Sequence, residues 1–473
     1  MERAEIEALV SEGADAVAAV IARLEARIDR QDAEIAELKA RLGQNSRNSS
    51  KPPSSDGYAK PSPKKRSLRR PSGRNPGGQE GHEGARLEAV ADPDERIEHA
   101  PERCGGCGGD LKDAERLEGG ERRQVFDLPE GKLLRAIEHV AERRRCGCGQ
   151  ITAAEFPEGV GAPTQYGPEV RALGVYLVVY QHLPYDRASQ ALGDLAGASV
   201  STGTLQRWVA SAAAGLTAFD ERLRELLLSA PVVHFDETGA RIAERLGWVH
   251  SQSTDTLTRY VAHRRRGGEA IDDAAVLPDY EGVAMHDGWK PYRNYESCEH
   301  ALCNGHHLRE LQAATEAGHG WPERMSELLI DAKQRVDRAL EAGEQSLGPK
   351  LLGKLEADYE RIIASGRAEH PPATGKKTKA HNLLLRLERD RVEVLRFAHD
   401  FCVPFTNNRA ESDIRMVKLQ QKISGSFRTA EGAARFLAVR GYISTARKNG
   451  VEALASLAAL TAGRPWMPMA CGP

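Results

Sequence analysis

Three acidic signatures in this chain could supply carboxylate chemistry. In sequence order they are His234-Phe235-Asp236-Glu237-Thr238-Gly239, Met285-His286-Asp287-Gly288 and Asn407-Asn408-Arg409-Ala410-Glu411. Carboxylate oxygens are the ligands that Mg²⁺ prefers, and bound Mg²⁺ keeps positions open for phosphate and water. Asp236, Asp287 and Glu411 therefore predict metal-dependent chemistry on phosphodiesters.

Each carboxylate alone has a simpler interpretation, because most Asp and Glu side chains lie solvated on the surface. Arg415 follows Glu411 by one helical turn, so these two residues could form a surface ion pair of little energetic weight. Glu237, beside Asp236, is an alternative metal ligand, although adjacent strand residues point to opposite faces.

The elements that must position these residues are strands. Asp236 follows the apolar pair Val232-Val233, and Asp287 follows the run from Gly282 to Met285. Both are expected at the C-terminal ends of buried strands, where sheet proteins place ligands. Strands are predicted near 232–233, 247–249, 257–262, 282–285 and 299–302, as a meander followed by crossovers.

The long gap before Glu411 predicts an inserted helical segment. Apolar residues after Trp321 mark three helix faces. The faces contain Met325, Leu328, Leu329, Ala332, Val336 and Leu340; then Leu352, Leu355, Tyr359, Ile362 and Ile363; then Leu384, Leu387, Val394 and Leu395. Cys303-x-x-His306 precedes them, and a structural role beside the second Asp is favoured over metal ligation, since a closed zinc site takes four ligands.

Several stretches together resemble the insertion-sequence-66 family of bacterial DDE transposases. They are QNSRNSSKPPSSDG (44–57), GGQEGHEG (77–84), HFDETG, MHDGW, CNGHHLREL (303–311) and PFTNNRAESDIR (404–415). By this resemblance, Asp236, Asp287 and Glu411 match the catalytic carboxylates. The resemblance also implies a ribonuclease-H-like fold with an all-helical insertion before the Glu.

The expected function is cleavage of double-stranded DNA at insertion-sequence ends and transfer of the strands to target DNA, with Mg²⁺ or Mn²⁺ as cofactor. One alternative is a ribonuclease-H-like nuclease that cuts without joining. The other is a catalytically silent zinc protein that dimerises and binds DNA as a regulator. Accessory transposition proteins are further candidate partners.

Charge is segregated along the chain, although the formal net charge of the 473 residues is only −2. Residues 51–74 are rich in Lys, Arg, Pro and Ser, which predicts a disordered basic linker that could lie along phosphates. The candidate DNA contacts there are Lys64, Lys65, Arg66, Arg69 and Arg70. A solvated tether without a partner is the alternative.

The chain starts with acidic residues and has no run long enough to span a bilayer, so neither a signal peptide nor a membrane partner is expected. The predicted location is the cytoplasm of a bacterium, in association with the nucleoid. In a reducing compartment the eight cysteines favour metal ligation or buried thiols over disulfides.

A heptad pattern between Ala14 and Leu42 predicts a two-stranded parallel coiled coil and a homodimer or higher oligomer. One seam position contains Ala14, Ile21, Ile28, Ile35 and Leu42, and the other contains Val17, Leu24, Gln31 and Leu38. One amphipathic helix packed on its own domain is the alternative.

Two cysteine pairs predict a structural zinc site. Cys104-x-x-Cys107 and Cys146-x-Cys148 each lie among glycines, and paired Cys turns of this kind form Cys₄ zinc sites. The second pair is one residue shorter than usual, which strains the chelate. A redox-active dithiol is the alternative.

Residues 185–208 predict two short helices joined by a turn, with Gly197 ending the first helix and Ser201 capping the second. In a helix-turn-helix, Thr204, Gln206 and Arg207 would face DNA. Simple packing of a helical hairpin is equally compatible. After Glu411, the cationic residues Arg415, Lys418 and Lys422 could face substrate phosphates or simply be solvated.

These features predict an α+β multidomain protein with a mixed-sheet core. The expected segments are a coiled-coil helix (1–45), a basic linker (46–95), a Cys₄ zinc module (96–160), a helix-turn-helix region (165–225), the first part of the catalytic core (226–311), a helical insertion (312–400), and the second part of the core with the C-terminal helices (401–473).

Overall fold

The structure is a computed structural model and describes residues 10–49, 89–97, 99, 101–113, 123–124, 133–145, 147–148, 150–370 and 377–469. The chain divides into two compact units. One consists of Met1–Ser62 together with Ile137–Pro473, and the other of Pro63–Ala136. The basic linker and its five candidate DNA contacts lie outside the described residues.

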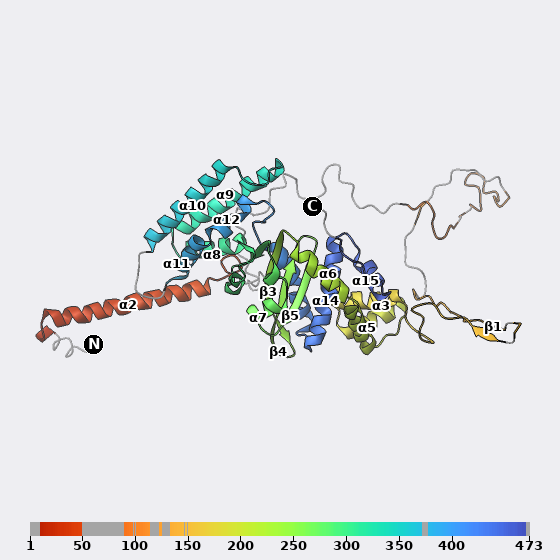
Figure 1. The fold of residues 1–473 in the computed structure, drawn as a ribbon. Coiled ribbons are helices and arrows are strands. Elements are labelled where there is room, and N and C mark those ends of the chain that lie inside the picture. Colours follow the sequence, from red (N-terminus) through yellow and green to blue (C-terminus); the bar gives the residue numbers. More distant parts are fainter. Residues whose placement is uncertain are drawn as a thin grey trace. The chain divides into compact units, whose positions relative to one another are not determined.

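A mixed five-stranded sheet forms the centre of the larger unit (Figure 1). Its strands are β3 (Val232–Ile242), β4 (Arg245–Ser253), β5 (Thr258–His263), β6 (Val283–His286) and β7 (Glu299–Leu302). Their order in space is β5-β4-β3-β6-β7. The first three form an antiparallel meander, whereas β6 lies parallel to β3 and β7 parallel to β6. All five strands appear where the sequence predicts them.

Helices precede, interrupt and follow this sheet. Before it lie α2 (Ala14–Leu42), the small strands β1 (Arg143–Arg145) and β2 (Ile151–Ala153), α3 (Pro168–Val175), the π-helical turn η2 (Tyr176–Tyr180), α4 (Tyr185–Ala196), α5 (Thr202–Ala214) and α6 (Thr217–Leu228). Within it are α7 (Gly268–Asp273) and the 3₁₀ turns η3 (Leu277–Asp279) and η4 (Lys290–Asn294). After the insertion come α13 (Asn408–Ser424), α14 (Ala430–Lys448) and α15 (Ala453–Thr461).

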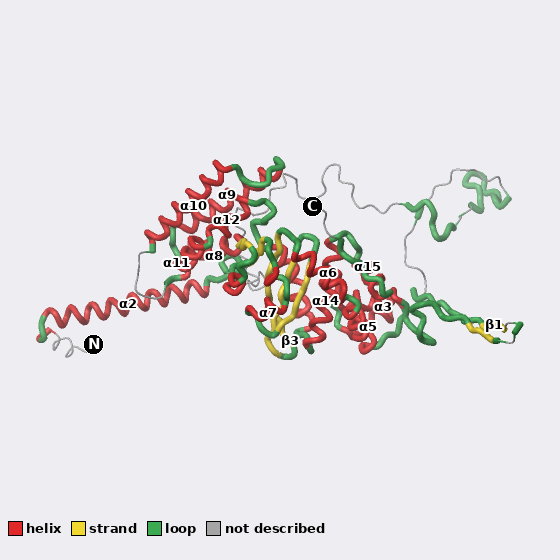
Figure 2. The backbone as a smooth tube through the Cα atoms, viewed as in Figure 1, coloured by secondary structure: helices red, strands yellow, loops and turns green. Residues whose placement is uncertain are grey.

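The helical insertion follows β7 and contains α8 (Asn304–Glu316), α9 (Trp321–Glu341), α10 (Pro349–Glu369), α11 (Lys379–Arg389) and α12 (Arg391–His399). These helices pack on one another (Figure 2) and have their own apolar core around Trp321 and Tyr359. The prediction of a single third helix was wrong. Asp390 separates α11 from α12, and its buried carboxylate accepts hydrogen bonds from Arg389 and pairs with Arg293.

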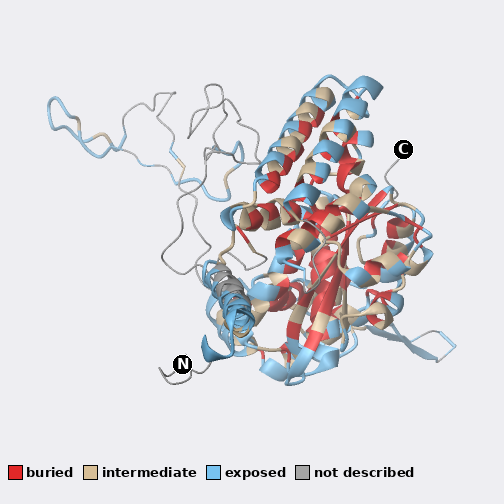
Figure 3. Ribbon diagram, turned by 90° about the vertical axis from the view of Figure 1, so that its left-hand side faces the viewer, coloured by how far each residue is buried: buried red, intermediate tan, exposed pale blue. Residues whose placement is uncertain are grey.

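The main apolar core contains residues of the sheet and of the helices that precede and follow it in sequence. Buried residues concentrate there (Figure 3). Helix α14 packs against β5, and its Gly441 allows close approach, since a Cβ there would lie 3.1 Å from the carbonyl oxygen of Thr258. Across the described residues, no helix combines the length and apolar character needed to cross a bilayer.

The predicted ends of α4 and α5 are observed. Gly197 takes a left-handed conformation (φ 68°) after α4, and the Ser201 hydroxyl accepts a hydrogen bond from the Thr204 amide at 3.2 Å. Gln206 and Arg207 are exposed on α5, whereas Thr204 is half-buried and accepts a hydrogen bond from Arg207. Recognition of DNA by this helix pair stays a prediction.

Candidate functional site

The sheet register brings Asp236 and Asp287 together. Strands β3 and β6 pair in parallel, with Val232 opposite Val283 and His234 opposite Met285. The same register, continued by two residues, places Asp236 beside Asp287, on the face shared by those residues. Asp236 does not end its strand as predicted, because β3 continues through a hairpin with β4; only β6 ends here.

Asn407 attaches the start of α13 to β3, which positions Glu411 in the first turn of that helix. The Asn407 side-chain amide donates to the carbonyl oxygen of Phe235 at 2.8 Å, and its Oδ1 lies 2.8 Å from Nδ1 of His234. The Asn407 backbone N–H donates to Sγ of Cys303 at 3.1 Å. All of these groups are buried, so the connection between helix and strand is rigid.

A second connection fixes the direction of α13. The Asp413 carboxylate forms an ion pair with Lys448 of α14 at 2.8 Å and accepts a hydrogen bond from Thr258 of β5 at 3.3 Å. The Tyr260 hydroxyl donates to the backbone oxygen of Asp413 at 2.9 Å. Helix α13 is thus held to the sheet at both Asn407 and Asp413, on either side of Glu411.

The other two carboxylates also act electrostatically on Asp236. The pKa of Asp236 is raised well above its ordinary value, first by burial and then by the negative charges of Glu237, Asp287 and Glu411. Backbone amides orient the two aspartates: Glu237 N–H donates to Asp236 at 2.9 Å, and Trp289 N–H donates to Asp287 at 2.8 Å. Gathered carboxylates of this kind favour a cation among them.

Glu237 lies in different surroundings from Asp236. Its side chain is 1% exposed, forms an ion pair with Arg266 at 2.5 Å and accepts a hydrogen bond from the Tyr292 hydroxyl at 2.5 Å. Arg266 in turn lies over the rings of Trp248 and Trp289, 5.0 and 4.1 Å from their centroids. Because its partners are already in place, Glu237 has a structural role and is a poor substitute ligand.

Glu411 contacts residues that begin α8. Its Oε1 lies 3.7 Å from Nδ1 of His306 and 3.8 Å from Arg309, and potential ligand atoms of Cys303, His306 and Glu411 all lie within 4.8 Å of one another. Burial, followed by the charge of Arg309, lowers the pKa of His306. Burial raises the pKa of Cys303 to about 11. Cys303 and His306 therefore lie beside Glu411 in space. In sequence they follow β7, the strand after Asp287.

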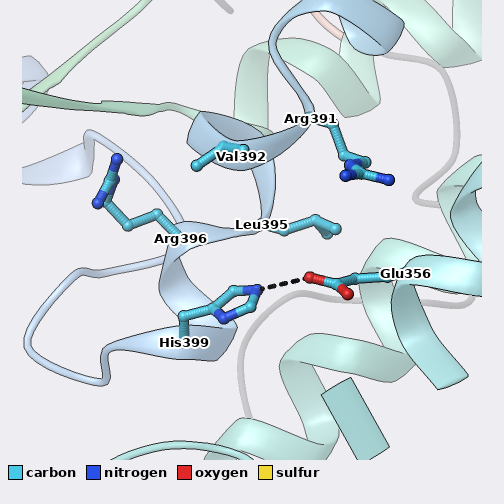
Figure 4. A pocket seen from close by; sticks show the side chains of 6 residues that line it. All are labelled: Glu356, Arg391, Val392, Leu395, Arg396 and His399. Atoms are coloured by element: carbon cyan, nitrogen blue, oxygen red, sulfur yellow. Dashed lines mark ion pairs between the residues drawn. The ribbon is translucent and has the colours of Figure 1, made fainter. Parts of the chain in front are cut away.

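Two surface hollows lie near these elements. One of about 230 Å³ is lined only by residues of α10 and α12, where His399 and Glu356 form an ion pair at 3.3 Å (Figure 4). The other, of about 710 Å³, includes Asn408, Arg409 and Ser412 from the first turns of α13. None of the three candidate carboxylates lines either hollow.

The other candidate residues lie on α13 and in the two cysteine pairs. On α13, Arg415, Lys418 and Lys422 are exposed, and the Lys418 ammonium group also donates to the carbonyl oxygen of Gly239 at 3.0 Å. Cys104 and Cys107 belong to the smaller unit, Cys148 belongs to the larger one, and Cys146 lies outside the described residues.

In the smaller unit, Cys104 and Cys107 lie in a tight turn, in which the amide of Gly108 donates to the carbonyl oxygen of Cys104 at 2.9 Å. Hydrogen bonds from the backbone, with that of Cys107 the strongest, lower the pKa of Cys104. A lowered pKa favours the thiolate form, which both metal ligation and redox chemistry use.

Sequence reasoning missed the part that Asn407 plays. The Asn407-Asn408 pair before Glu411 was a usable signal, because a short amide side chain at a helix start often bonds nearby backbone. Its partners, His234 and Phe235, are too distant in sequence to be identified from that pattern.

Two family models match parts of this chain. A family model described as Transposase IS66 family matches residues 163–435, more than half of the chain and a range that contains all three carboxylates. A second model, described as a family of unknown function (DUF6444), matches residues 2–88. No curated protein matches the chain. From the match to residues 163–435 it follows that this chain belongs to the IS66 family of transposases.

Proposed function

We propose that the protein cuts DNA at the ends of an insertion sequence and joins those ends to target DNA, with Asp236, Asp287 and Glu411 as its catalytic carboxylates. The observation that carries this proposal is the parallel pairing of β3 with β6, together with the hydrogen bonds by which Asn407 attaches the start of α13 to β3. The raised pKa of Asp236 supports it. The antiparallel meander followed by parallel strands, with helices inserted before Glu411, supports a ribonuclease-H-like core.

The three carboxylates fit a hard divalent cation. They offer only oxygen ligands, and their mutual repulsion in a partly buried site is relieved when a cation lies among them. When bound, Mg²⁺ or Mn²⁺ would lower the pKa of a water or a DNA 3′-hydroxyl and stabilise the leaving oxygen.

The protein itself would contribute to the reaction by positioning the three carboxylates. Asn407 holds Glu411 against β3, and the backbone amides of Glu237 and Trp289 orient Asp236 and Asp287. Positioning of this kind contributes to rate because the ligands need no reorganisation when DNA binds. Arg415, Lys418 and Lys422 extend from the same helix as Glu411 and would contact phosphates.

DNA binding is assigned to two further regions. Thr204, Gln206 and Arg207 of α5 would contact a groove as part of a helix-turn-helix, with Ser201 capping the start of α5. The basic segment with Lys64, Lys65, Arg66, Arg69 and Arg70 would follow the phosphate backbone. The protein would act in the bacterial cytoplasm, in association with the nucleoid.

Structural zinc is assigned to Cys104, Cys107, Cys146 and Cys148. The turn around Cys104 supports this, since hydrogen bonds that lower a thiol's pKa favour the thiolate that binds Zn²⁺. Zinc analysis of protein purified without chelators should find bound metal. Its absence would favour the redox alternative.

Homodimerisation is assigned to α2. Its seam residues Ile21, Leu24, Ile28, Ile35 and Leu38 are between 47% and 55% exposed, which leaves an apolar stripe for a second copy to cover. Deleting residues 1–45 should lower the molar mass measured by light scattering to that of the monomer. An unchanged mass would assign the helix to another role.

The test of the catalytic proposal is Asp287→Asn, assayed with Mg²⁺ and DNA that carries the ends of the protein's own element. Cleavage and joining should fall by at least ~10³-fold, because a catalytic metal contributes several kcal/mol. DNA binding should be retained. Glu281→Gln, which removes an exposed acid just before β6, is the matched control and should remain active.

The same assay separates the alternatives. Cleavage by the wild-type protein without joining to a plasmid would identify a nuclease. Binding without Mg²⁺-dependent nicking would identify a regulator. Strand transfer retained by Asp287→Asn would overturn the assignment of this residue.

A further inference from the structure

Two buried atoms at the start of α13 and α8 face each other without a hydrogen bond. Nδ1 of His306 and Oε1 of Glu411 are both inaccessible to solvent and have no hydrogen-bond partner, although they lie 3.7 Å apart. An unsatisfied buried polar atom costs free energy, so a pair of them indicates a missing partner.

The third group beside these atoms is the Cys303 thiol. The ligand atoms of Cys303, His306 and Glu411 all lie within 4.8 Å of one another. Cys303 is buried, and its Sγ already accepts a hydrogen bond from the Asn407 amide at 3.1 Å. That bond orients the sulfur and stabilises negative charge on it, as outer partners of metal ligands do.

The distance between His306 and Glu411 is close to that between two ligands of a small tetrahedral ion. With metal-ligand bonds of 2.0 to 2.2 Å, nitrogen and oxygen ligands of one tetrahedral Zn²⁺ lie about 3.4 Å apart. The observed 3.7 Å exceeds this by a few tenths of an ångström and is too long for a hydrogen bond. Small side-chain movements would bring Cys303, His306 and Glu411 to bonding distance of one ion.

We propose that Cys303, His306 and Glu411 form a binding site for a thiophilic divalent cation of the Zn²⁺ class. Sulfur, imidazole nitrogen and carboxylate oxygen together select Zn²⁺ or Cd²⁺ over Mg²⁺, which prefers oxygen ligands alone. Three protein ligands leave a fourth position open. The site is separate in composition from the cysteine pairs at 104–107 and 146–148, and from Asp236 and Asp287.

Arg309 competes with the ion. Its guanidinium lies 3.8 Å from the same oxygen of Glu411, so a bound cation must displace or tolerate this positive charge. Removing the charge while keeping a polar side chain should therefore tighten ion binding. A purely structural ion pair between Arg309 and Glu411 predicts no such gain.

The proposal rests partly on Glu411, which the proposed function also uses, so an ion bound here would restrain one of its catalytic carboxylates. The test needs neither DNA nor activity. Cd²⁺ is titrated into the full-length protein, and the ultraviolet charge-transfer band between thiolate and Cd²⁺ reports ligation by sulfur.

Cys303→Ser should remove one thiolate's share of the band, whereas Cys298→Ser, which alters another buried thiol of the same region, should leave the band unchanged. His306→Gln should weaken this component by at least ~10-fold, since even outer partners of metal ligands contribute that much. Arg309→Gln should strengthen it several-fold.

An identical band in Cys303→Ser, or equal affinity in His306→Gln and Arg309→Gln, would overturn the proposal. The His306 and Arg309 variants keep every cysteine, so a folding defect in Cys303→Ser does not prevent the test. Failure here would leave the cleavage results for Asp287→Asn untouched. Conversely, retained cleavage by Asp287→Asn would not affect the result for Cd²⁺ binding.

Discussion

Asp236 and Glu237 are neighbours on β3, and their surroundings differ between the two faces of the sheet. Asp236 points to the face where Asp287 and Glu411 add negative charge. It forms no ion pair among the described residues, and Lys418 interacts with it only through longer-range charge. Glu237 points to the other face, where Arg266 and Tyr292 satisfy its carboxylate. Both residues are acidic and burial raises the pKa of both, yet only Glu237 is balanced by a cationic partner and a hydroxyl donor.

The difference teaches how to separate a structural carboxylate from a functional one. A balanced group such as Glu237 stabilises the fold, and its removal leaves its partners unsatisfied. An unbalanced group such as Asp236 opposes folding until a ligand arrives. The sign of a stability change therefore distinguishes the two roles.

Glu237→Ala should produce the largest change in stability. It leaves Arg266 and the buried Tyr292 hydroxyl without their carboxylate, which should cost about 2–4 kcal/mol in the free energy of unfolding. Urea denaturation measures this. Asp279→Ala, which breaks the exposed pair with Arg224, should cost less than about 1 kcal/mol. Equal costs would break the comparison.

Mg²⁺ should stabilise the wild-type protein but not Asp236→Asn. At a free concentration about ten times the dissociation constant, binding to the folded state alone adds about 1.4 kcal/mol. Thermal melts with and without Mg²⁺ measure the gain, and Glu281→Gln is expected to keep it. If Asp236→Asn gains as much as wild type, the cation binds elsewhere.

Without metal, Asp236→Asn should be more stable than wild type at neutral pH, by on the order of 1 kcal/mol. Because folding raises the pKa of Asp236, ionisation of this group destabilises the folded state. The difference should vanish below the ordinary Asp pKa of about 3.9 and grow as the pH rises through the raised value. Melts in chelator across this range would show a flat difference if Asp236 were unperturbed.

Much of the sheet could be predicted from the sequence, because each strand is a short apolar or β-branched run between turns. The same runs predicted strand ends at Asp236 and Asp287, and only the second is observed. They did not reveal that β3 continues to Ile242, since its second half alternates in burial and is paired with β4 and, at its end, with Phe427. Strand length is set by the partner strand as well as by local composition.

Features that depend on distant contacts could not be predicted. The break between α11 and α12 follows from the burial of Asp390 against Arg293, which lies on the other side of β7 in sequence. The proximity of Cys303 and His306 to Glu411 likewise depends on how α8 and α13 meet. A Cys-x-x-His spacing identifies two ligands, but it contains no information about a third that lies beyond the helical insertion.

The chain leaves the sheet and returns to it at adjacent points. The Asn304 amide donates to the carbonyl oxygen of Phe405 at 3.1 Å, so helices α8 to α12 extend from a single closed base. Helix α12 also contacts β7, and α8 carries His306 beside Glu411. Substitutions on the exposed surfaces of α9 and α10 should therefore leave the spacing of Asp236, Asp287 and Glu411 unchanged, so these two helices can vary while the three carboxylates keep their places.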